Sequence, residues 1–174
     1  MINAWYYTDW LYRPRMADEL DPARGGGVLF RQGPHQVDIV RTLGGGMVRS
    51  VRGHTSMLNA GRPVEGSYLA FLEFEHGAAG TIAFNGYGYF DSHELTWRLG
   101  ESGSPEAQDR HARAHQQMGR FERQEDEWEL KNSLRYGGAR AGQWGAVGHH
   151  RPGGESTDVA PHQPFFGLTV VTCE

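Results

Sequence analysis

The stretch from Arg24 to Gly46 constrains the fold more than any other part of the chain. Three consecutive glycines open it, three close it, and the apolar residues between them recur mostly at helical spacing. A glycine run suits the end of a helix, where the backbone enters the left-handed conformation. The pattern therefore predicts one helix over residues 27–43. Pro34 has no amide hydrogen and should kink that helix.

One flank of the predicted helix carries three polar side chains. Arg31 and His35 are four residues apart and His35 and Asp38 are three apart, which are the spacings of neighbours on a helix surface. A guanidinium, an imidazole and a carboxylate are therefore expected on one flank. A buried helix with a solvated polar edge explains the pattern equally well, so spacing alone leaves both readings open.

A second cationic feature precedes this helix. Arg13 and Arg15 flank a proline and form a fixed cationic corner after the aromatic N-terminal segment. Guanidinium groups match carboxylates in shape and charge, so both arginines are candidate anion ligands. The alternative is structural pairing with the acidic residues that follow, namely Asp18, Glu19 and Asp21.

Aromatic or alternating segments on both sides of the helix predict strands. The expected strands cover residues 2–13, 47–57, 67–75, 78–87, 94–99 and 165–172. A His-Gly turn joins the third and fourth of these, which should form an antiparallel hairpin. Short connections favour an α+β fold: an open, mostly antiparallel sheet with helices on one face. The other face is rich in aromatic residues and is expected to pack on another subunit or domain.

Residues 101–160 differ in composition from the rest of the chain and are treated as an insert. The charged part, residues 101–136, predicts one or two surface helices, and the glycine-rich part, 137–160, predicts a long loop. His111 and His115 have the spacing of two zinc ligands on a helix. No third ligand stands nearby, so a solvated helix face is preferred and no metal is expected.

Composition excludes several classes of function. The net charge of −4 gives no general attraction to nucleic acid. The single cysteine, Cys173, excludes an internal disulfide and fits a reducing, cytoplasmic setting. No apolar run approaches the roughly 20 residues of a membrane span, and the N-terminus has no basic-then-apolar leader.

The order of these motifs resembles a known family. The motifs are Arg-Pro-Arg at 13–15, Gly-Gly-Gly-x-Leu at 25–29, Gly-x-His-x-x-Asp at 33–38, Leu-Gly-Gly at 43–45 and Phe-Glu-His-Gly-Ala at 74–78. They are similar to the C-terminal domain of the glucose–fructose oxidoreductase/inositol dehydrogenase/MocA family, well over residues 1–100 and weakly over 162–174. The resemblance implies a fold like the C-terminal domain of glyceraldehyde-3-phosphate dehydrogenase.

The resemblance also implies a two-domain oxidoreductase that uses NAD or NADP. In that family an N-terminal Rossmann domain binds the nucleotide and supplies a lysine from a Glu-Lys-Pro motif. This chain has neither that motif nor Gly-x-Gly-x-x-Gly, and its one lysine, Lys131, lies in the insert. Residues 1–174 are therefore expected to be the substrate-binding and oligomerisation domain alone, inactive by itself. Its expected partners are the Rossmann domain and further copies of itself, bound through the open sheet face.

By this resemblance His35 is the catalytic residue, acting with the lysine of the other domain. The family commonly has Asp at the position of Arg31, and an arginine there disfavours protonation of the imidazole. Arg31 is therefore expected to anchor a substrate carboxylate. Arg13 and Arg15 would support it. Asp38 is counted with the substrate-binding residues and would fix the tautomer of His35 if the two side chains meet; a helix cap or an ion pair is its alternative role.

That residue set suits a small acidic substrate and is similar to the branch that oxidises phthalate cis-dihydrodiols. Two alternatives stay open: a sugar or cyclitol dehydrogenase of the same family, with a polyhydroxylated substrate, and a non-catalytic module that binds a ligand and dimerises through its sheet.

Overall fold

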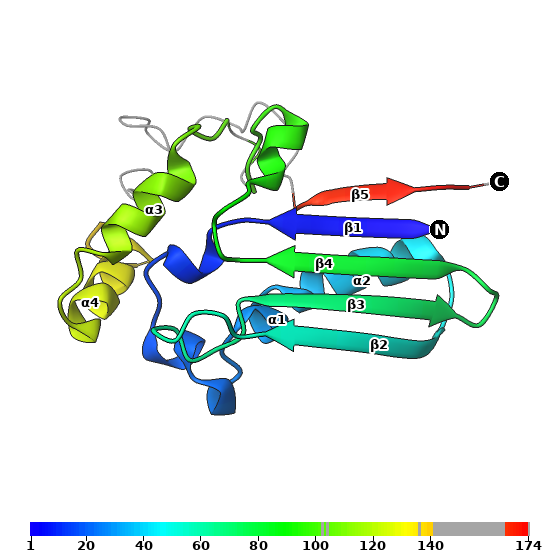
Figure 1. The fold of residues 1–174 in the computed structure, drawn as a ribbon, viewed down its shortest axis with the longest axis horizontal. Coiled ribbons are helices and arrows are strands. Elements are labelled where there is room, and N and C mark those ends of the chain that lie inside the picture. The colour runs from blue at the N-terminus through cyan, green and yellow to red at the C-terminus, as the bar shows by residue number, and fades with distance from the viewer. Residues whose placement is uncertain (102, 104, 136, 141–165, 174) are drawn as a thin grey trace.

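The computed structural model describes residues 1–101, 103, 105–135, 137–140 and 166–173. Its body is a five-stranded sheet in the order β2-β3-β4-β1-β5 (Figure 1). The strands are β1 Ile2–Tyr7, β2 Val48–Ser56, β3 Ser67–Phe74, β4 Ala79–Asn85 and β5 Leu168–Val171. β1 runs parallel to β4, and every other neighbouring pair is antiparallel. The predicted α+β fold and the predicted hairpin are both confirmed.

The first strand is shorter than predicted. Alternate residues of β1 enter the core, among them Ala4 and Tyr6, whereas Trp5 is exposed on the other face. Trp10 and Leu11 are both buried although they are consecutive. A strand would direct two successive side chains to opposite faces, so the chain instead turns into a 3₁₀ helix, η1 Trp10–Tyr12.

The sequence predicted a single helix over residues 27–43. This prediction was wrong, because the segment forms two helices. They are α1 Val28–Arg31 and α2 Gly33–Gly44, and the break lies at Gln32, with φ −121° and ψ −33°. Pro34 sits in the first turn of α2, where a missing amide hydrogen leaves no helix bond unmade. The predicted glycine end is confirmed, because Gly45 follows α2 with φ 69°.

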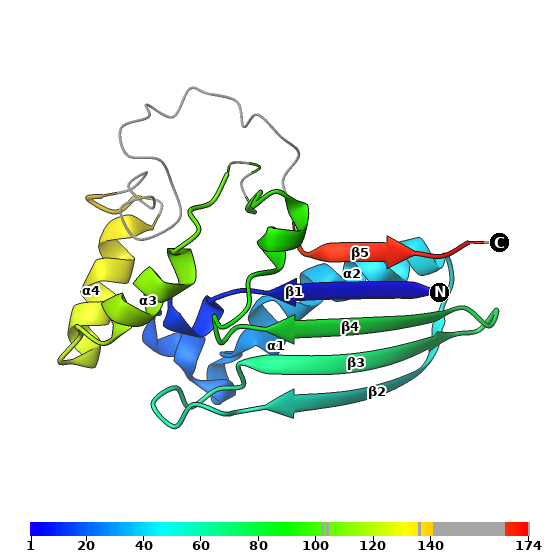
Figure 2. The same cartoon turned by 45° about the horizontal axis from the view of Figure 1, so that its top comes forward.

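α2 covers one face of the sheet and leaves the other open (Figure 2). It contacts β1 and β4. Gly44 approaches the sheet so closely that an added Cβ would lie 2.2 Å from the Phe74 ring. The core between α2 and the sheet includes Val40, Tyr68, Leu72 and Ile82.

The strand predicted over residues 94–99 is wrong, because this segment forms a 3₁₀ helix, η4 Ser92–Thr96. The carboxylate of Asp91 accepts the amide hydrogen of His93 at 3.0 Å and starts that helix. Trp97 and Arg98 follow with φ of 53° and 57°, a left-handed conformation that no strand continues.

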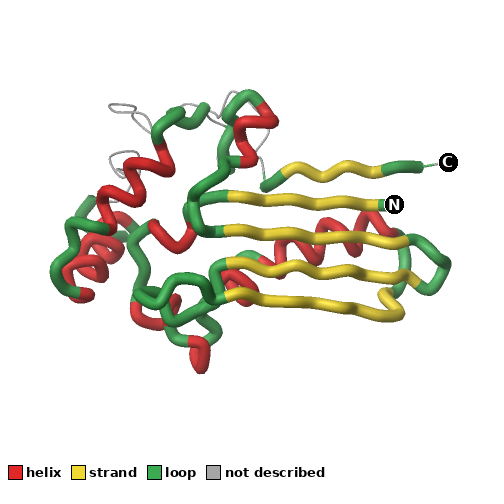
Figure 3. Tube along the Cα trace, viewed as in Figure 1, coloured by secondary structure: helices red, strands yellow, loops and turns green. Residues whose placement is uncertain are grey.

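Two further helices, α3 Arg110–Met118 and α4 Gln124–Leu134, confirm the helices predicted in the insert. They lie beyond the end of β1 and not under the sheet (Figure 3). They are not simply surface helices, since Arg110, Glu127 and Leu134 are buried. Most of the predicted loop, from residue 141 to 160, lies outside the described residues. None of the described helices combines the length and hydropathy that crossing a bilayer requires.

Candidate functional site

The predicted catalytic histidine lies in the first turn of α2 and is exposed. His35 lines an open hollow of about 620 Å³ together with Pro34, Asp38, Ile39 and Phe166. Its ring meets the Phe166 ring edge to face, with 5.1 Å between the ring centroids. An exposed imidazole next to an aromatic wall is accessible to a ligand and to water.

The aromatic wall of this hollow comes from the far end of the chain. Phe166 precedes β5, and its ring also contacts Tyr6, with 4.8 Å between centroids. The next residue, Gly167, has φ 79°, and an added Cβ would lie 2.5 Å from the carbonyl oxygen of Trp5. Only glycine allows the chain to approach β1 so closely, and this approach places Phe166 on His35. Sequence reasoning missed Phe166, although the Phe-Phe-Gly segment before a strand was visible.

Asp38 lines the same hollow as His35, but its ion pair is with another residue. Its carboxylate lies 3.8 Å from the Arg41 guanidinium. Among the described residues no hydrogen bond joins Asp38 to His35, so the carboxylate does not fix the tautomer of the imidazole here.

Arg31 ends α1 and does not line the hollow of His35. Its guanidinium donates to the Gly25 carbonyl at 3.0 Å and to the Asp18 carboxylate at 2.9 Å. The hydrogen bond from Arg31 lowers the pKa of Asp18. The four-residue spacing from Arg31 to His35 crosses the helix break, so the two side chains do not share one continuous helix face.

Arg13 follows η1, and its guanidinium lies among polar groups just beyond the C-terminal end of β1. Its Nε donates to Asp9 at 2.7 Å and its Nη2 to the Thr8 hydroxyl at 2.8 Å. Its Nη1 lies 3.6 Å from Oε1 of Glu101, which also accepts a hydrogen bond from the Tyr6 hydroxyl. Arg13 is therefore the member of the arginine corner that faces a carboxylate near the surface.

Arg15 is buried and its guanidinium faces the protein interior. It donates twice to the Trp10 carbonyl, at 3.0 and 2.8 Å, and pairs with Glu19 at 2.9 Å. The guanidinium carbon lies 3.7 Å from the Trp10 ring centroid, and burial lowers the pKa of Arg15 to about 10. The backbone amide of Arg15 donates to Glu127, at 2.6 Å. These contacts hold the arginine corner to η1 and α4.

A buried network that the sequence did not reveal joins α3 to β1. Arg110 donates to Thr8 at 3.0 Å and pairs with Glu106 at 3.0 Å and with Asp91 at 3.4 Å. Burial alone would raise the pKa of Asp91, but the hydrogen bond from His93 and the charge of Arg110 lower it to about 2. No sequence signal marked Arg110, because an arginine in a charge-dense segment is usually solvated.

His111 and His115 make separate contacts on α3. His111 Nε2 lies 3.6 Å from Asp91, whereas His115 Nε2 lies 3.0 Å from the Tyr87 carbonyl and its ring stacks on Tyr12. Within the part of the chain that the structure describes, no group of three His, Cys, Asp or Glu residues is arranged to hold a metal ion.

The glycine-rich start of α1 does not fit a nucleotide phosphate. The amides of Val28 and Leu29 already donate to Glu65, to its carbonyl at 3.2 Å and its carboxylate at 3.0 Å. A Cβ at Gly27 would collide with the same carboxylate. A carboxylate therefore occupies the position at this helix start that a pyrophosphate would need.

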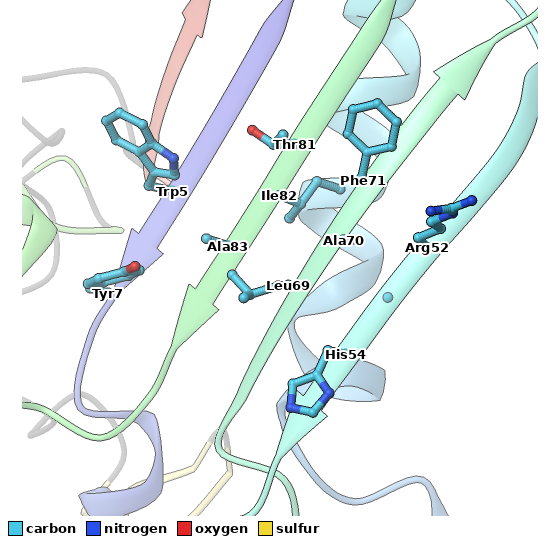
Figure 4. A pocket seen from close by; sticks show the side chains of 11 residues that line it. Trp5, Tyr7, Arg52, His54, Leu69, Ala70, Phe71, Thr81, Ile82 and Ala83 are labelled. Carbon is cyan, nitrogen blue, oxygen red and sulfur yellow. The ribbon is translucent and has the colours of Figure 1, made fainter.

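The open face of the sheet has an apolar hollow of its own, about 590 Å³ in volume (Figure 4). Trp5 and Tyr7 from β1, Leu69 and Phe71 from β3, and small residues of β4 line it, with Arg52 and His54 of β2 at one side. Trp5, Leu69 and Phe71 remain at least 41% exposed. This face lies opposite α2 and is separate from the hollow of His35.

Comparison with known proteins connects the chain to dehydrogenases. Residues 1–105 match the GFO/IDH/MocA C-terminal domain. Over 173 residues the chain is 32% identical to a 1-carboxy-3-chloro-3,4-dihydroxycyclo hexa-1,5-diene dehydrogenase of Comamonas testosteroni, covering 99% of this chain and 41% of that protein.

One solved structure agrees with this relationship over the whole chain. The "putative dehydrogenase" of Bordetella bronchiseptica RB50 is 36% identical, with a TM-score of 0.81 over 100% of this chain and 41% of its own. The WlbA dehydrogenase of Bordetella pertussis, solved with NADH and UDP-GlcNAcA, is 29% identical with a TM-score of 0.41 over 52% of this chain and 28% of its own. That second overlap is too partial for its ligands to inform this site. The chain thus spans about two fifths of the length of the first two relatives.

Proposed function

Because the chain belongs to the GFO/IDH/MocA family, we propose that it is the substrate-binding part of an NAD(P)-dependent oxidoreductase that oxidises a carbinol of an acidic cyclic substrate. The observation that carries this proposal is the exposed His35 imidazole, set in a hollow beside the Phe166 ring. The substrate class is supported by the 32% identical relative, whose name describes a carboxylated, dihydroxylated ring. In the proposed reaction the nicotinamide nucleotide accepts a hydride, and a Rossmann domain outside this chain binds that nucleotide.

Within this proposal His35 takes up the proton of the substrate hydroxyl, directly or by relay. A neutral imidazole is a competent base near pH 7. Asp38 lines the same hollow, and its carboxylate is paired with Arg41.

The arginines have different proposed roles. Arg13 faces Glu101 near the surface and is proposed to bind the acidic group of the substrate. Arg31 is proposed as a second anchor, which would require it to exchange Asp18 for the substrate. Arg15, held by Trp10 and Glu19, is proposed to support binding by fixing the loop that carries Arg13.

The test is a dehydrogenase assay of the full-length protein with NAD⁺ and with NADP⁺. Carboxylated aromatic cis-dihydrodiols would be compared with the same diols lacking the carboxylate, and with sugars and cyclitols. We expect the highest kcat/KM for the carboxylated diols. Preference for sugars or cyclitols would contradict the acidic substrate class, and turnover of none of them would favour a non-catalytic ligand-binding module.

We also propose that the open sheet face binds a second copy of the chain. Its exposed residues Trp5, Leu69 and Phe71 form an apolar surface at the centre of the sheet, and soluble monomers seldom leave such a surface uncovered. Two such faces can stack at the roughly 10 Å spacing of packed sheets.

A further inference from the structure

A hydroxyl and a guanidinium meet at one carboxylate oxygen near the C-terminal end of β1, the first by a hydrogen bond and the second by an ion pair. The Tyr6 hydroxyl donates to Oε1 of Glu101, and Nη1 of Arg13 lies 3.6 Å from the same oxygen. This is the arrangement in which a protein binds a carboxylate: a neutral donor and a guanidinium directed at one acceptor.

The two donors are held in place by the core. Tyr6 is fully buried, and its ring lies edge to face against Phe84 and Phe166. The other two nitrogens of the Arg13 guanidinium are bound by Asp9 and Thr8. Burial and the charge of Glu101 raise the pKa of Tyr6 well above its usual value, so its hydroxyl keeps the proton that it donates.

The acceptor, in contrast, belongs to the surface. The Glu101 side chain is 43% exposed, whereas that of Arg13 is 14% exposed. Glu101 stands in the connection between η4 and α3, outside any helix or strand. Movement of this one side chain into solvent would uncover both donors without disturbing the sheet.

We propose that Tyr6 and Arg13 form a binding site for the carboxylate of the substrate, and that Glu101 occupies this site while no substrate is bound. The proposal rests on the function proposed above, in which the substrate is acidic. An incoming carboxylate replaces another carboxylate, so each donor keeps an acceptor of the same charge. The Phe166 ring touches both Tyr6 and His35, so the site lies one aromatic ring away from the imidazole.

The proposal is tested by the binding of phthalate to the full-length protein without nucleotide, measured by titration calorimetry. Glu101→Gln removes the competing charge and keeps the side-chain size. We expect it to tighten the Kd for phthalate about 5-fold, because a partly exposed ion pair is worth up to about 1 kcal/mol. Tyr6→Phe removes one donor and should weaken binding.

Glu94→Gln is the matched control. Glu94 pairs with Arg98 at 3.2 Å, and its side chain is 48% exposed, so this variant removes the same charge from a similar surface position. We expect it to leave the Kd unchanged. An unchanged or weaker Kd for Glu101→Gln would overturn the proposal, as would an equal tightening in Glu94→Gln. Because Glu101 is on the surface, Glu101→Gln decides the matter even where Tyr6→Phe does not fold.

A parallel turnover assay separates this inference from the proposed function. Carboxylate binding that responds to Glu101→Gln without turnover of any diol would retain the site and refute the dehydrogenase proposal. Turnover without measurable phthalate binding to wild type or Glu101→Gln would refute the site and retain the dehydrogenase proposal.

Discussion

His35 reaches solvent because it lies on the outer side of the first turn of α2. Pro34 and His35 are exposed in this turn, whereas Gly33 and Gln36 are buried. The imidazole therefore contributes little packing to the fold. Its removal tests chemistry and not folding.

We expect His35→Ala in the full-length protein to lower kcat by about 10²–10⁴-fold, the usual contribution of a positioned acid or base. Steady-state kinetics with the preferred diol measures this loss. His54→Ala, an exposed histidine of β2 on the open sheet face, is the control and should keep kcat near wild type. A kcat for His35→Ala equal to that of the control would remove His35 from the reaction.

Arg110 stabilises the fold because carboxylates surround it in a buried position. Replacement by methionine removes the guanidinium that pairs with Glu106 and Asp91, and breaking a buried ion pair typically costs about 3–5 kcal/mol. We expect this loss in the free energy of unfolding, measured with denaturant. Arg113→Met is the control on the same helix, where the arginine is 49% exposed and should change stability by at most about 0.5 kcal/mol. Equal effects of the two variants would contradict the buried network.

Asp91 should make the free energy of unfolding depend on pH in the acidic range. Its folded pKa is about 2, below the value of about 4 that an unfolded aspartate has. The ionised carboxylate therefore stabilises the folded state above the unfolded pKa, and this contribution is lost as the pH falls toward the folded value. We expect Asp91→Asn to flatten the pH dependence of the unfolding free energy between about pH 4 and pH 2. Asp109→Asn, at an exposed position, should retain the wild-type slope.

The elements that the sequence predicted well are those built from local contacts. The glycine end of α2 and the hairpin of β3 and β4 follow from neighbouring residues, and both are present. The 3₁₀ helix η4 did not follow, because Asp91 pairs with Arg110 of α3 and His93 contacts Tyr6 of β1. The break at Gln32 likewise depends on how α1 and α2 pack on different parts of the sheet.

In the site, too, the sequence predicted contacts between neighbouring residues and missed contacts between distant segments. His35 and Asp38 line one hollow because they lie within one turn of one helix, a relation that sequence spacing conveys. Phe166 and Glu101 reach the site through contacts with β1, and the Tyr6–Glu101 hydrogen bond spans 95 residues of sequence. No spacing rule reveals such a contact.

β5 is expected to depend on a single glycine. Gly167→Ala combines a strained φ of 79° with a Cβ that would lie 2.5 Å from the Trp5 carbonyl. We expect it to detach β5 from β1 and to lower the unfolding free energy by more than the roughly 1 kcal/mol that left-handed strain alone costs. Gly77→Ala, with φ 90° and open space around it, reports that strain alone. Denaturant midpoints measure both, and equal shifts would contradict a packing role for Gly167.

At the scale of the whole molecule, the two faces of the sheet carry different proposed functions, substrate binding on one and association on the other. The hollow of His35 lies by α2, and the apolar hollow lies on the open face. If two copies associate through the open face, the His35 hollow of each copy remains accessible on the outside of the dimer. Association and substrate binding would then be separable by mutation.

We expect Leu69→Glu to convert the assembled protein into smaller species, measured by sedimentation or light scattering. Leu69 is 57% exposed on the open face, where a buried charge would oppose association. Val51→Glu is the control, since Val51 pairs with Leu72 and so lies on the opposite face of the same sheet, 61% exposed. A monomeric wild type, or dissociation by the control alone, would contradict the proposed interface.

The position of β1 also has a consequence for biosynthesis. Its neighbours in the sheet are β4, residues 79–85, and β5, residues 168–171. As the nascent chain leaves the ribosome, β1 therefore waits for β4 until residue 85 has been made and for β5 until residue 171 has been made. Translation that stalls between β4 and β5 would release a chain in which β1 is an uncovered edge strand, a template on which other unfinished chains aggregate.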